Sequence, residues 1–229
     1  MEDSLHIVFC TKEKDEKVDK LIENIKETCG CEPKITVCLN PEGEGLTKAY
    51  NEILDMPEID GDTIVFIHDD IEFMREGWGK EVLRLFEEHE DYGIIGVAGS
   101  AEFDQMGAWW QYKKIFGQVL HRSEGKSWLT TFSPLLDHDL EEVCVIDGLF
   151  MAIRKDRIGK RFDEENFGMQ FYDISFCLDN FLDGCTKIGV TTNIRIAHNS
   201  VGALKPEWHE SKQKMIEKYS QYFPITVKK

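Results

Sequence analysis

Three short apolar runs near the start of the chain constrain its fold more than any other feature. They are "LHIVFC" (residues 5–10), "KITVCL" (residues 34–39) and "TIVFIH" (residues 63–68), and together they are rich in Val, Ile and Phe. Runs of this length and composition are typical of β-strands that are covered on both faces, as the strands of a parallel sheet are. The sequence therefore predicts a buried, mostly parallel sheet.

The segments between these runs have helical periodicity. Their apolar residues recur at spacings of three and four, at Val18, Leu21, Ile22 and Ile25 in the first segment and at Leu46, Tyr50, Ile53 and Leu54 in the second. Gly30 is a stop signal for the first helix. The resulting order, strand-helix-strand-helix-strand, predicts right-handed crossovers and a ligand site at the carboxyl ends of the strands.

The middle of the chain continues this alternation and then loses it. Residues 78–86 have the periodicity of a helix, and "YGIIGVAGS" (residues 92–100) is typical of a fourth strand. Residues 101–139 are irregular and aromatic, with segments that could pair as a hairpin. A long, loosely patterned stretch of this kind is typical of a binding loop.

The last third returns to regular elements. "EVCVIDGLFMAIRKD" (residues 142–156) predicts a strand pair or a bent strand, with Gly148 permitting the bend. The remaining elements are a helix from near Asp173 to Gly184, a late strand in residues 185–200 that ends at His198, and a helix that begins at Pro206. Strands and helices thus alternate over most of the chain, as in an α/β domain.

The charge balance excludes one class of partner. The chain has 43 acidic and 27 basic residues, a formal net charge of -16. Such a charge repels the phosphate backbone of nucleic acids, so we expect no nucleic-acid partner, and it disfavours binding to an anionic membrane. The phosphates of a small substrate would need a divalent cation or a helix N-terminus.

The apolar content indicates a soluble chain. No apolar run approaches the roughly 18 residues of a membrane span, and the start "MEDSLHIVFC" lacks the pattern of a signal peptide. We therefore expect no transmembrane segment and a cytoplasmic protein.

The seven cysteines are an odd number in mostly regular surroundings, which favours free buried thiols. A length of 229 residues fits a single domain.

His68, Asp69 and Asp70 end the third apolar run and form a candidate metal site. Hard divalent cations take oxygen ligands, and a carboxylate at a strand end can share such a cation with a diphosphate. The alternative is that the two carboxylates only cap a loop or face solvent. Their position favours the site, because the third strand of a strand-helix repeat can hold a ligand rigidly at the predicted binding edge.

A second candidate lies in "FDEENFGMQFYDISFCLDN" (residues 162–180). Asp173 is expected at a helix N-terminus, where the helix dipole favours the carboxylate, so that it could accept a proton from a hydroxyl group. Gly168 permits close approach of a ligand, and Tyr172 offers a neighbouring hydroxyl group. The alternative is that Asp173 is only a helix N-cap.

Two further sets of residues are weaker candidates. His198, at a strand end in "IAHNSVG", could bind the same cation or a phosphate, although a single histidine is more often satisfied by backbone partners. Trp109, Trp110 and Tyr112 could stack on sugar rings, although adjacent tryptophans are as often packed in a core or a lid. The patterns leave these alternatives open.

Taken together, these motifs resemble the family 2-like nucleotide-diphospho-sugar glycosyltransferases of the GT-A fold, of the small bacterial type. The resemblance extends from about Leu5 to Trp208 and includes "LTKAYNEILD", "VFIHDDIEF", "VIDGLFMAIRK", "FDEENFGMQFYDISFCL" and "HNSVG". It implies a Rossmann-like, mostly parallel central sheet flanked by helices, with a smaller mixed region on the acceptor side. Residues 1–100 would form the nucleotide-binding half and residues 101–229 the acceptor-binding half of one domain.

The resemblance also implies roles for individual residues. It assigns Asp173 as the catalytic base and Asp70 and His198 as metal ligands. The nucleotide-side residues that it implies are Cys10, Thr11, Asn40, Ala49, Asn51, His68 and Asp69, and the acceptor-side residues are Trp109, Trp110, Asp147, Gly148 and Tyr172. The first strand lacks the Pro-x-Tyr-Asn ending common in the family, and the Asp-x-Asp motif begins here with His68.

The chemistry implied is transfer of a sugar from a nucleoside diphosphate, with a UDP-sugar favoured, to a glycan or lipid-linked acceptor with inversion, assisted by Mn²⁺ or Mg²⁺. The implied setting is bacterial surface glycan synthesis. Two alternatives remain open at this point: a sugar nucleotidyltransferase, and a non-catalytic nucleotide-sugar-binding or scaffolding domain of the same fold. The first normally has a Gly-rich, basic loop after the first strand, and "CTKEKDEKVDK" contains no glycine.

Overall fold

A seven-stranded sheet forms the centre of the molecule. The computed structural model describes residues 5–43, 45–59, 63–200 and 206–228. Across the sheet the strands are ordered β10 (Glu141–Val143), β13 (Lys187–Val190), β5 (Tyr92–Gly96), β12 (Phe150–Arg154), β3 (Thr63–Ile67), β1 (Leu5–Thr11) and β2 (Lys34–Leu39). All of these strands run in one direction except β12 and β10, which are antiparallel to their neighbours. The predicted mostly parallel α/β sheet is therefore confirmed.

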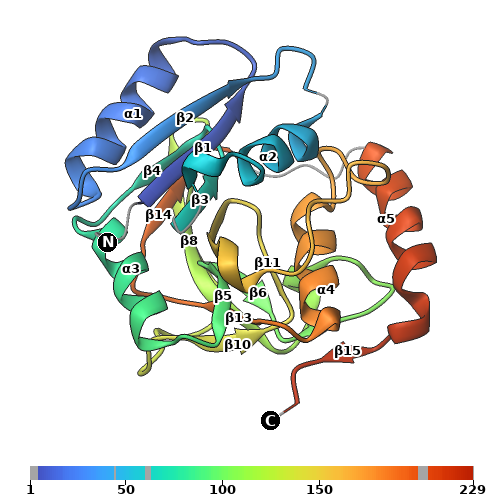
Figure 1. The fold of residues 1–229 in the computed structure, drawn as a ribbon. Helices are drawn as coiled ribbons and strands as arrows, with labels where there is room; N and C mark the ends of the chain where they lie inside the picture. Colours follow the sequence, from blue (N-terminus) through green and yellow to red (C-terminus); the bar gives the residue numbers. More distant parts are fainter. Residues whose placement is uncertain (1–4, 44, 60–62, 201–205, 229) are drawn as a thin grey trace.

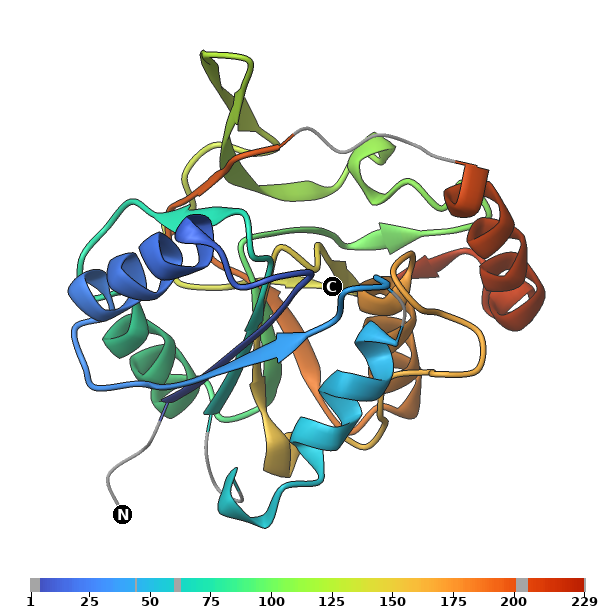
Figure 2. The same ribbon diagram turned by 90° about the horizontal axis from the view of Figure 1, so that it is seen from above.

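Helices cover both faces of this sheet (Figure 1). The helices of the described residues are α1 (Glu16–Thr28), α2 (Leu46–Leu54), α3 (Trp78–Glu88), α4 (Tyr172–Asp183) and α5 (Pro206–Tyr219), with short 3-10 helices η1 (Pro57–Ile59), η2 (Trp109–Gln111), η3 (Lys155–Arg157) and η4 (Ser220–Tyr222). Figure 2 shows α1 and α3 on one side of the sheet and α2 and α4 on the other. No helix in the described part of the chain is long and apolar enough to cross a membrane.

The first helix shows why the local sequence adopts this structure. The Asp15 side chain caps α1 by accepting hydrogen bonds from the N–H groups of Lys17 and Val18 at 3.0 and 3.1 Å. The buried face of α1 carries Val18, Leu21 and Ile25, as the periodicity predicts. Gly30 then turns the chain with a φ of +81°, and a Cβ atom there would lie 2.8 Å from the Cα atom of Gly77.

A second sheet lies beside the carboxyl ends of the parallel strands. Its strands are ordered β11 (Val145–Ile146), β6 (Ala98–Ser100), β8 (Ile115–Ser123), β14 (Ile196–His198) and β4 (Ile71–Phe73), and β9 (Lys126–Thr131) extends it from β8. A two-stranded sheet pairs β15 (Ile225–Thr226) with β7 (Glu102–Phe103). The smaller mixed region implied by the resemblance thus corresponds to strands that close over one edge of the main sheet.

Three of the predicted strand segments are each divided between the two sheets. Residues 92–100 form β5 and β6, residues 142–156 contribute to β10, β11 and β12, and residues 185–200 contain β13 and β14. In each case the chain leaves the seven-stranded sheet for the second sheet, or returns from it. Both sheets are buried at these points, so the apolar pattern continues through the change of sheet and gives no sign of it.

Part of the predicted loop is regular structure. Residues 101–139 contain the hairpin of β8 and β9, in which the two strands pair from Gln118–Thr131 to Ser123–Lys126. Glu124 and Gly125 form its two-residue turn with φ values of 51° and 74°. Positive φ values at both turn residues match the right-handed twist of the strands and make this a tight hairpin.

Candidate functional site

His68, Asp70 and His198 come from separate strand ends and meet in one cluster. His68 directly follows β3, Asp70 directly precedes β4, and His198 ends β14. Nε2 of His198 lies 3.2 Å from Oδ1 of Asp70, and Nδ1 of His68 lies 3.9 Å from the same oxygen. One ligand atom of each residue lies within 4.8 Å of the others. This spacing allows all three residues to bind one metal ion.

Backbone hydrogen bonds fix the cluster. The antiparallel pairing of β14 with β4 brings His198 beside Asp70. The N–H group of Asn199 donates to the carbonyl oxygen of Asp70 at 2.8 Å, and the N–H group of His68 donates to the carbonyl oxygen of Leu149 at 3.2 Å. Strand pairing thus positions the three side chains before any ligand binds, which reduces the ordering cost of binding.

The electrostatics of the cluster keep its carboxylate ionised. Burial alone would raise the pKa of Asp70, but the hydrogen bond and charge of His198 and the charge of His68 outweigh it and lower the pKa to about 2. Burial lowers the pKa of His68. Burial also opposes protonation of His198, but the contact with Asp70 outweighs it and raises the pKa of His198. The cluster thus presents an ionised carboxylate, the form that binds a cation.

The donor set of the cluster indicates which ion it fits. Two imidazole nitrogens and one carboxylate oxygen suit a divalent transition-metal ion better than Mg²⁺, which prefers oxygen ligands. The sequence resemblance placed His68 on the nucleotide side, whereas the structure brings it together with Asp70 and His198. The residue that departs from the family motif is therefore part of the candidate metal centre.

A second group of metal-type side chains has a different explanation. Glu88, His89 and Asp139 also lie within ligand distance of one another. The guanidinium group of Arg84 donates to both carboxylate oxygens of Asp139, at 2.9 and 3.0 Å, and also pairs with Glu88. Arg84 already supplies the positive charge that a metal ion would bring, so we do not assign a metal site there.

Asp173 lies in the first turn of α4, where its carboxylate is partly buried. Oδ2 accepts a hydrogen bond from the N–H group of Gly148 at 2.7 Å, and Oδ1 accepts one from the N–H group of Ile174 at 2.9 Å. Burial and then the charge of Asp147 raise the pKa of Asp173 to about 7, although the two N–H groups act in the opposite direction. A carboxyl group with this pKa can take up and release a proton near neutral pH, as a general base must.

The residue before the first turn of α4 has an unusual backbone. Phe171 has a φ of 61°, in the left-handed region that a bulky side chain rarely adopts. Its buried ring packs against Trp208 with the centroids 5.3 Å apart, and its carbonyl oxygen accepts a hydrogen bond from Ser175 at 2.8 Å. Packing therefore stabilises a strained turn next to Asp173, and such strain is common at functional sites.

Tyr172 connects Asp173 to the cluster of His68, Asp70 and His198, which we call the metal-type cluster. Its hydroxyl group donates to the carbonyl oxygen of Gly148 at 3.2 Å and lies 3.2 Å from Nε2 of His68. A Cβ atom at position 148 would lie 2.2 Å from the Tyr172 oxygen, so the approach requires glycine. The structure thus brings Asp147, Gly148 and Tyr172 together, with the hydroxyl of Tyr172 acting as a buried bridge.

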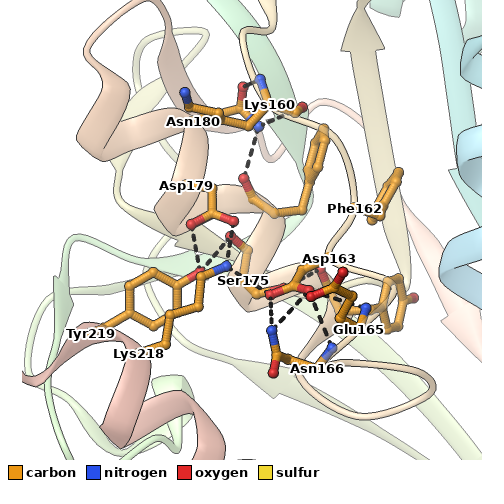
Figure 3. A network of polar contacts seen from close by, with 12 residues as sticks. Lys160, Phe162, Asp163, Glu165, Asn166, Ser175, Asp179, Asn180, Lys218 and Tyr219 are labelled. Atoms are coloured by element: carbon orange, nitrogen blue, oxygen red, sulfur yellow. Dashed lines mark hydrogen bonds and ion pairs between the residues drawn. The ribbon is translucent and has the colours of Figure 1, made fainter.

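A network of polar contacts holds residues 160–166 against α4 and α5 (Figure 3). Nζ of Lys218 lies 2.9 Å from Oδ2 of Asp163 and 2.7 Å from Oδ2 of Asp179. The hydroxyl group of Tyr219 donates to Oδ1 of Asp179 at 2.8 Å. Asp163 is therefore occupied by structural contacts that fix α4 in place.

Asn51 has all of its side-chain hydrogen bonds within the protein. Nδ2 donates to the carbonyl oxygen of Phe162 at 2.9 Å and to Oε1 of Glu164 at 2.6 Å, while Oδ1 accepts from the N–H group of Phe162 at 3.0 Å. The residue is 3% exposed. In this structure Asn51 ties α2 to residues 162–164, and its contact with a nucleotide stays a prediction.

The other predicted nucleotide-side residues gather at the carboxyl ends of the parallel strands. Cys10 and Thr11 end β1, and the N–H group of Asn40, directly after β2, donates to the carbonyl oxygen of Thr11 at 2.8 Å. Ala49 lies in α2. The pKa of the Cys10 thiol is raised by its hydrogen bond with Cys38, by burial and by the charge of the nearby Asp69. Because β1, β2 and β3 are parallel, these residues share a sheet edge with the His68 cluster.

The two tryptophans proposed from the sequence to face a sugar pack against other aromatic rings. Trp109 is 4% exposed and packs edge-on against Phe132, with the centroids 4.9 Å apart. Trp110 is partly buried between Trp109 and Trp208, at centroid distances of 5.9 and 6.4 Å. Core packing, the alternative that the sequence left open, describes Trp109, and an acceptor role for either residue stays a prediction.

Sequence reasoning missed His121 and Trp128. The His121 ring lies 5.8 Å from the ring of His198 and is stacked on the ring of Trp128, with the centroids 5.6 Å apart. Both residues belong to the segment that was predicted to be a loop. Reading residues 118–131 as two alternating strands around Glu124 and Gly125 would have placed the two rings on one face.

Comparison with known proteins gives a family and a fold. A sequence model of a family described as a glycosyltransferase-like family matches residues 6–229. Among solved structures, A197 from STIV is 14% identical over 86% of each chain, with a TM-score of 0.50, and this shows a shared fold. CMP:2-keto-3-deoxy-manno-octonic acid synthetase complexed with CTP is 9% identical over 94% of this chain and 100% of that chain, but its TM-score of 0.42 supports no conclusion. No curated protein matches the chain.

Proposed function

The chain belongs to the glycosyltransferase-like family, and from this premise we propose that it transfers a sugar from a nucleoside diphosphate to an acceptor hydroxyl group, with inversion at the anomeric carbon. We favour a UDP-sugar as the donor, a glycan or lipid-linked acceptor, and a role in bacterial surface glycan synthesis. One observation carries the proposal. The Tyr172 hydroxyl lies 3.2 Å from His68 of the metal-type cluster, and Tyr172 directly precedes Asp173, whose pKa is raised to about 7.

His68, Asp70 and His198 would hold the divalent cation, Mn²⁺ or Mg²⁺, and their two imidazole nitrogens favour Mn²⁺. When bound, such an ion acts as a Lewis acid that stabilises the charge on the departing nucleoside diphosphate. The formal net charge of -16 also requires a local positive charge wherever an anionic donor binds. The imidazole groups of His68 and His198 and the carboxylate of Asp70 lie close enough to share one ligand, which supports this assignment.

Asp173 would act as the catalytic base. Its carboxylate accepts the proton of the acceptor hydroxyl group as that oxygen attacks the anomeric carbon from the face opposite the departing diphosphate. The N–H groups of Gly148 and Ile174 hold the carboxylate in one orientation. Protonation removes the repulsion between Asp173 and Asp147, so the neighbouring charge of Asp147 favours proton uptake.

The two parts of the chain would have different ligands. Residues 1–100 would bind the nucleotide at the ends of β1, β2 and β3, through Cys10, Thr11, Asn40, Ala49, Asn51 and Asp69. Residues 101–229 would bind the acceptor around Asp147, Gly148 and Tyr172. Parallel strands that end beside a candidate cation cluster support this division, because ligands of open α/β sheets bind at the carboxyl ends of the strands.

A screen of nucleotide sugars tests the proposed function. The protein is incubated with Mn²⁺, a panel of UDP-, GDP- and CMP-sugars, and simple glycosides as acceptors, and release of nucleotide is measured together with formation of the product. We expect transfer from a nucleoside diphosphate sugar, with an inverted anomeric configuration of the product in NMR spectra. Release of pyrophosphate from a nucleoside triphosphate and a sugar phosphate would instead indicate a nucleotidyltransferase. The absence of both activities would contradict catalysis.

A further inference from the structure

Four strands of the second sheet place one row of side chains on a common face. In the pairings of β4, β14, β8 and β9, the cross-strand partners in this row are Ile71, His198, His121 and Trp128. Directly opposed residues on neighbouring strands project from the same face of a sheet. His198, a member of the metal-type cluster, therefore shares a face with His121 and Trp128 of the β8–β9 hairpin.

The rings of this row are in contact. The centroids of His198 and His121 are 5.8 Å apart, and those of His121 and Trp128 are 5.6 Å apart, with the last two rings stacked at 21°. Nδ1 of His121 also lies 3.5 Å from the carbonyl oxygen of Ser200. His121 is therefore held between the cluster and the indole and fixes the orientation of Trp128.

Trp128 differs from the tryptophans of the core in its exposure. It is 39% exposed, whereas Trp78 is 1% and Trp109 is 4% exposed. The hairpin that carries it projects from the body of the molecule (Figure 2) and is closed by the tight turn at Glu124 and Gly125. A paired hairpin thus presents a large aromatic ring to solvent beside the candidate active site. Because a tryptophan side chain has only two χ angles, fixing it on binding costs little conformational entropy.

We propose that Trp128 and His121 form a saccharide-binding subsite, in which the indole of Trp128 stacks on a sugar ring. The C–H groups of one face of a pyranose ring pack on the electron-rich face of an aromatic ring, and such contact needs no charge on the ligand. A contact with an uncharged ligand suits a protein with a formal net charge of -16, because the ligand is not repelled. The role of this subsite in transfer rests on the proposed function. The sugar ring that the subsite binds belongs either to the acceptor or to the transferred sugar.

Saturation-transfer NMR with methyl glycosides of common hexoses and N-acetylhexosamines tests the subsite without requiring transfer. We expect Trp128→Ala to weaken binding of the preferred glycoside roughly tenfold, Trp128→Phe to retain part of it, and His121→Ala to weaken it less than Trp128→Ala. Leu129→Ala is the matched control, because Leu129 is 57% exposed on the same strand and points to the other face. Unchanged glycoside binding by Trp128→Ala would overturn the subsite, and so would an effect on UDP binding alone.

The same variants separate the subsite from the proposed function. If transfer occurs, a higher KM for the acceptor in Trp128→Ala identifies an acceptor ring, and a higher KM for the donor with unchanged UDP affinity identifies the transferred sugar. If no transfer is found but Trp128→Ala loses glycoside binding, the subsite stands and the proposed function fails. If transfer and glycoside binding both survive in Trp128→Ala, the proposed function stands and the subsite fails.

Discussion

The carboxylate of Asp173 accepts a hydrogen bond from the backbone N–H group of Gly148 at 2.7 Å. The contact joins the first turn of α4 to the chain between β11 and β12. The carbonyl oxygen of Gly148 in turn accepts a hydrogen bond from Tyr172, the neighbour of Asp173. Gly148 is thus bound through both of its backbone polar groups, and its position determines where the Asp173 carboxylate lies.

Asp173→Asn should reduce transfer by about 10²–10⁴-fold, because an amide of the same shape cannot accept the acceptor proton. Binding of nucleoside diphosphate should change little, because the metal-type cluster is left intact. Initial rates and calorimetric titration with UDP and Mn²⁺ measure the two effects. Asp137→Asn is the matched control, because the Asp137 side chain is 99% exposed. Full activity in Asp173→Asn would rule out its role as the base.

The pH dependence of transfer should follow Asp173. Its pKa is raised from 3.8 to about 7, so the ionised base forms, and the rate should rise, as the pH increases through about 7. The same shift affects stability. The folded protein binds this proton more tightly than the unfolded chain does, so the stabilisation present below pH 4 is lost between about pH 4 and 7. Between pH 5 and 8, Tm should therefore fall less in Asp173→Asn than in the wild type, and equal losses would contradict the raised pKa.

Gly148→Ala should destabilise the fold by about 1–3 kcal/mol and reduce transfer, because the new methyl group would overlap the ring of Tyr172. Urea unfolding measures the first effect and initial rates measure the second. Tyr172→Phe in the same chain removes the nearest atom and should restore part of the stability. Gly168→Ala is the control, because no atom lies within 4 Å of a Cβ at that position. Equal stability of the two alanine variants would contradict the close approach.

A nucleoside diphosphate should raise Tm more in the presence of Mn²⁺ than in its absence. Asp70→Asn should remove the effect of the ion, because it takes away the single carboxylate of the cluster. His68→Ala should weaken the effect of the ion, which tests as a metal ligand the residue that the resemblance assigned to the nucleotide side. Asp139→Asn serves as the comparison, since Asp139 is paired with Arg84. A thermal shift that is independent of the ion, or unaffected by Asp70→Asn, would remove the metal site.

Lys218→Met should lower the free energy of unfolding by about 1–2 kcal/mol, because it leaves Asp163 and Asp179 without their shared partner. Chemical denaturation measures the change. Lys214→Met, at an exposed position of the same helix, should have little effect. If the two variants are equally stable, the network does not anchor α5 to α4.

Much of the fold could be predicted because it depends on local patterns. The alternation of apolar runs gave β1, β2 and β3, and the spacing of residues such as Leu21 and Ile25 gave α1. Asp70, Asp173 and His198 could be singled out because each stands at the end of an element, where polar side chains reach a ligand. These inferences needed only near neighbours in the chain.

The grouping of the site could not be predicted in the same way. His198 meets Asp70 because β14 pairs with β4, and Trp128 meets His121 because β8 pairs with β9. Trp109 is buried and Trp128 exposed, although each stands in an aromatic stretch of the same predicted loop. Exposure and strand partners depend on contacts between distant segments, and no local periodicity records them.

The sequence by itself therefore determined the order and type of the elements from β1 to β3, the net negative charge and most of the polar residues at the sheet edge. The tertiary structure decided that His68 joins Asp70 and His198, and that Gly148 holds Asp173. The physical reason is that periodicity reports which face of an element is buried, whereas register between distant strands decides which side chains share that face.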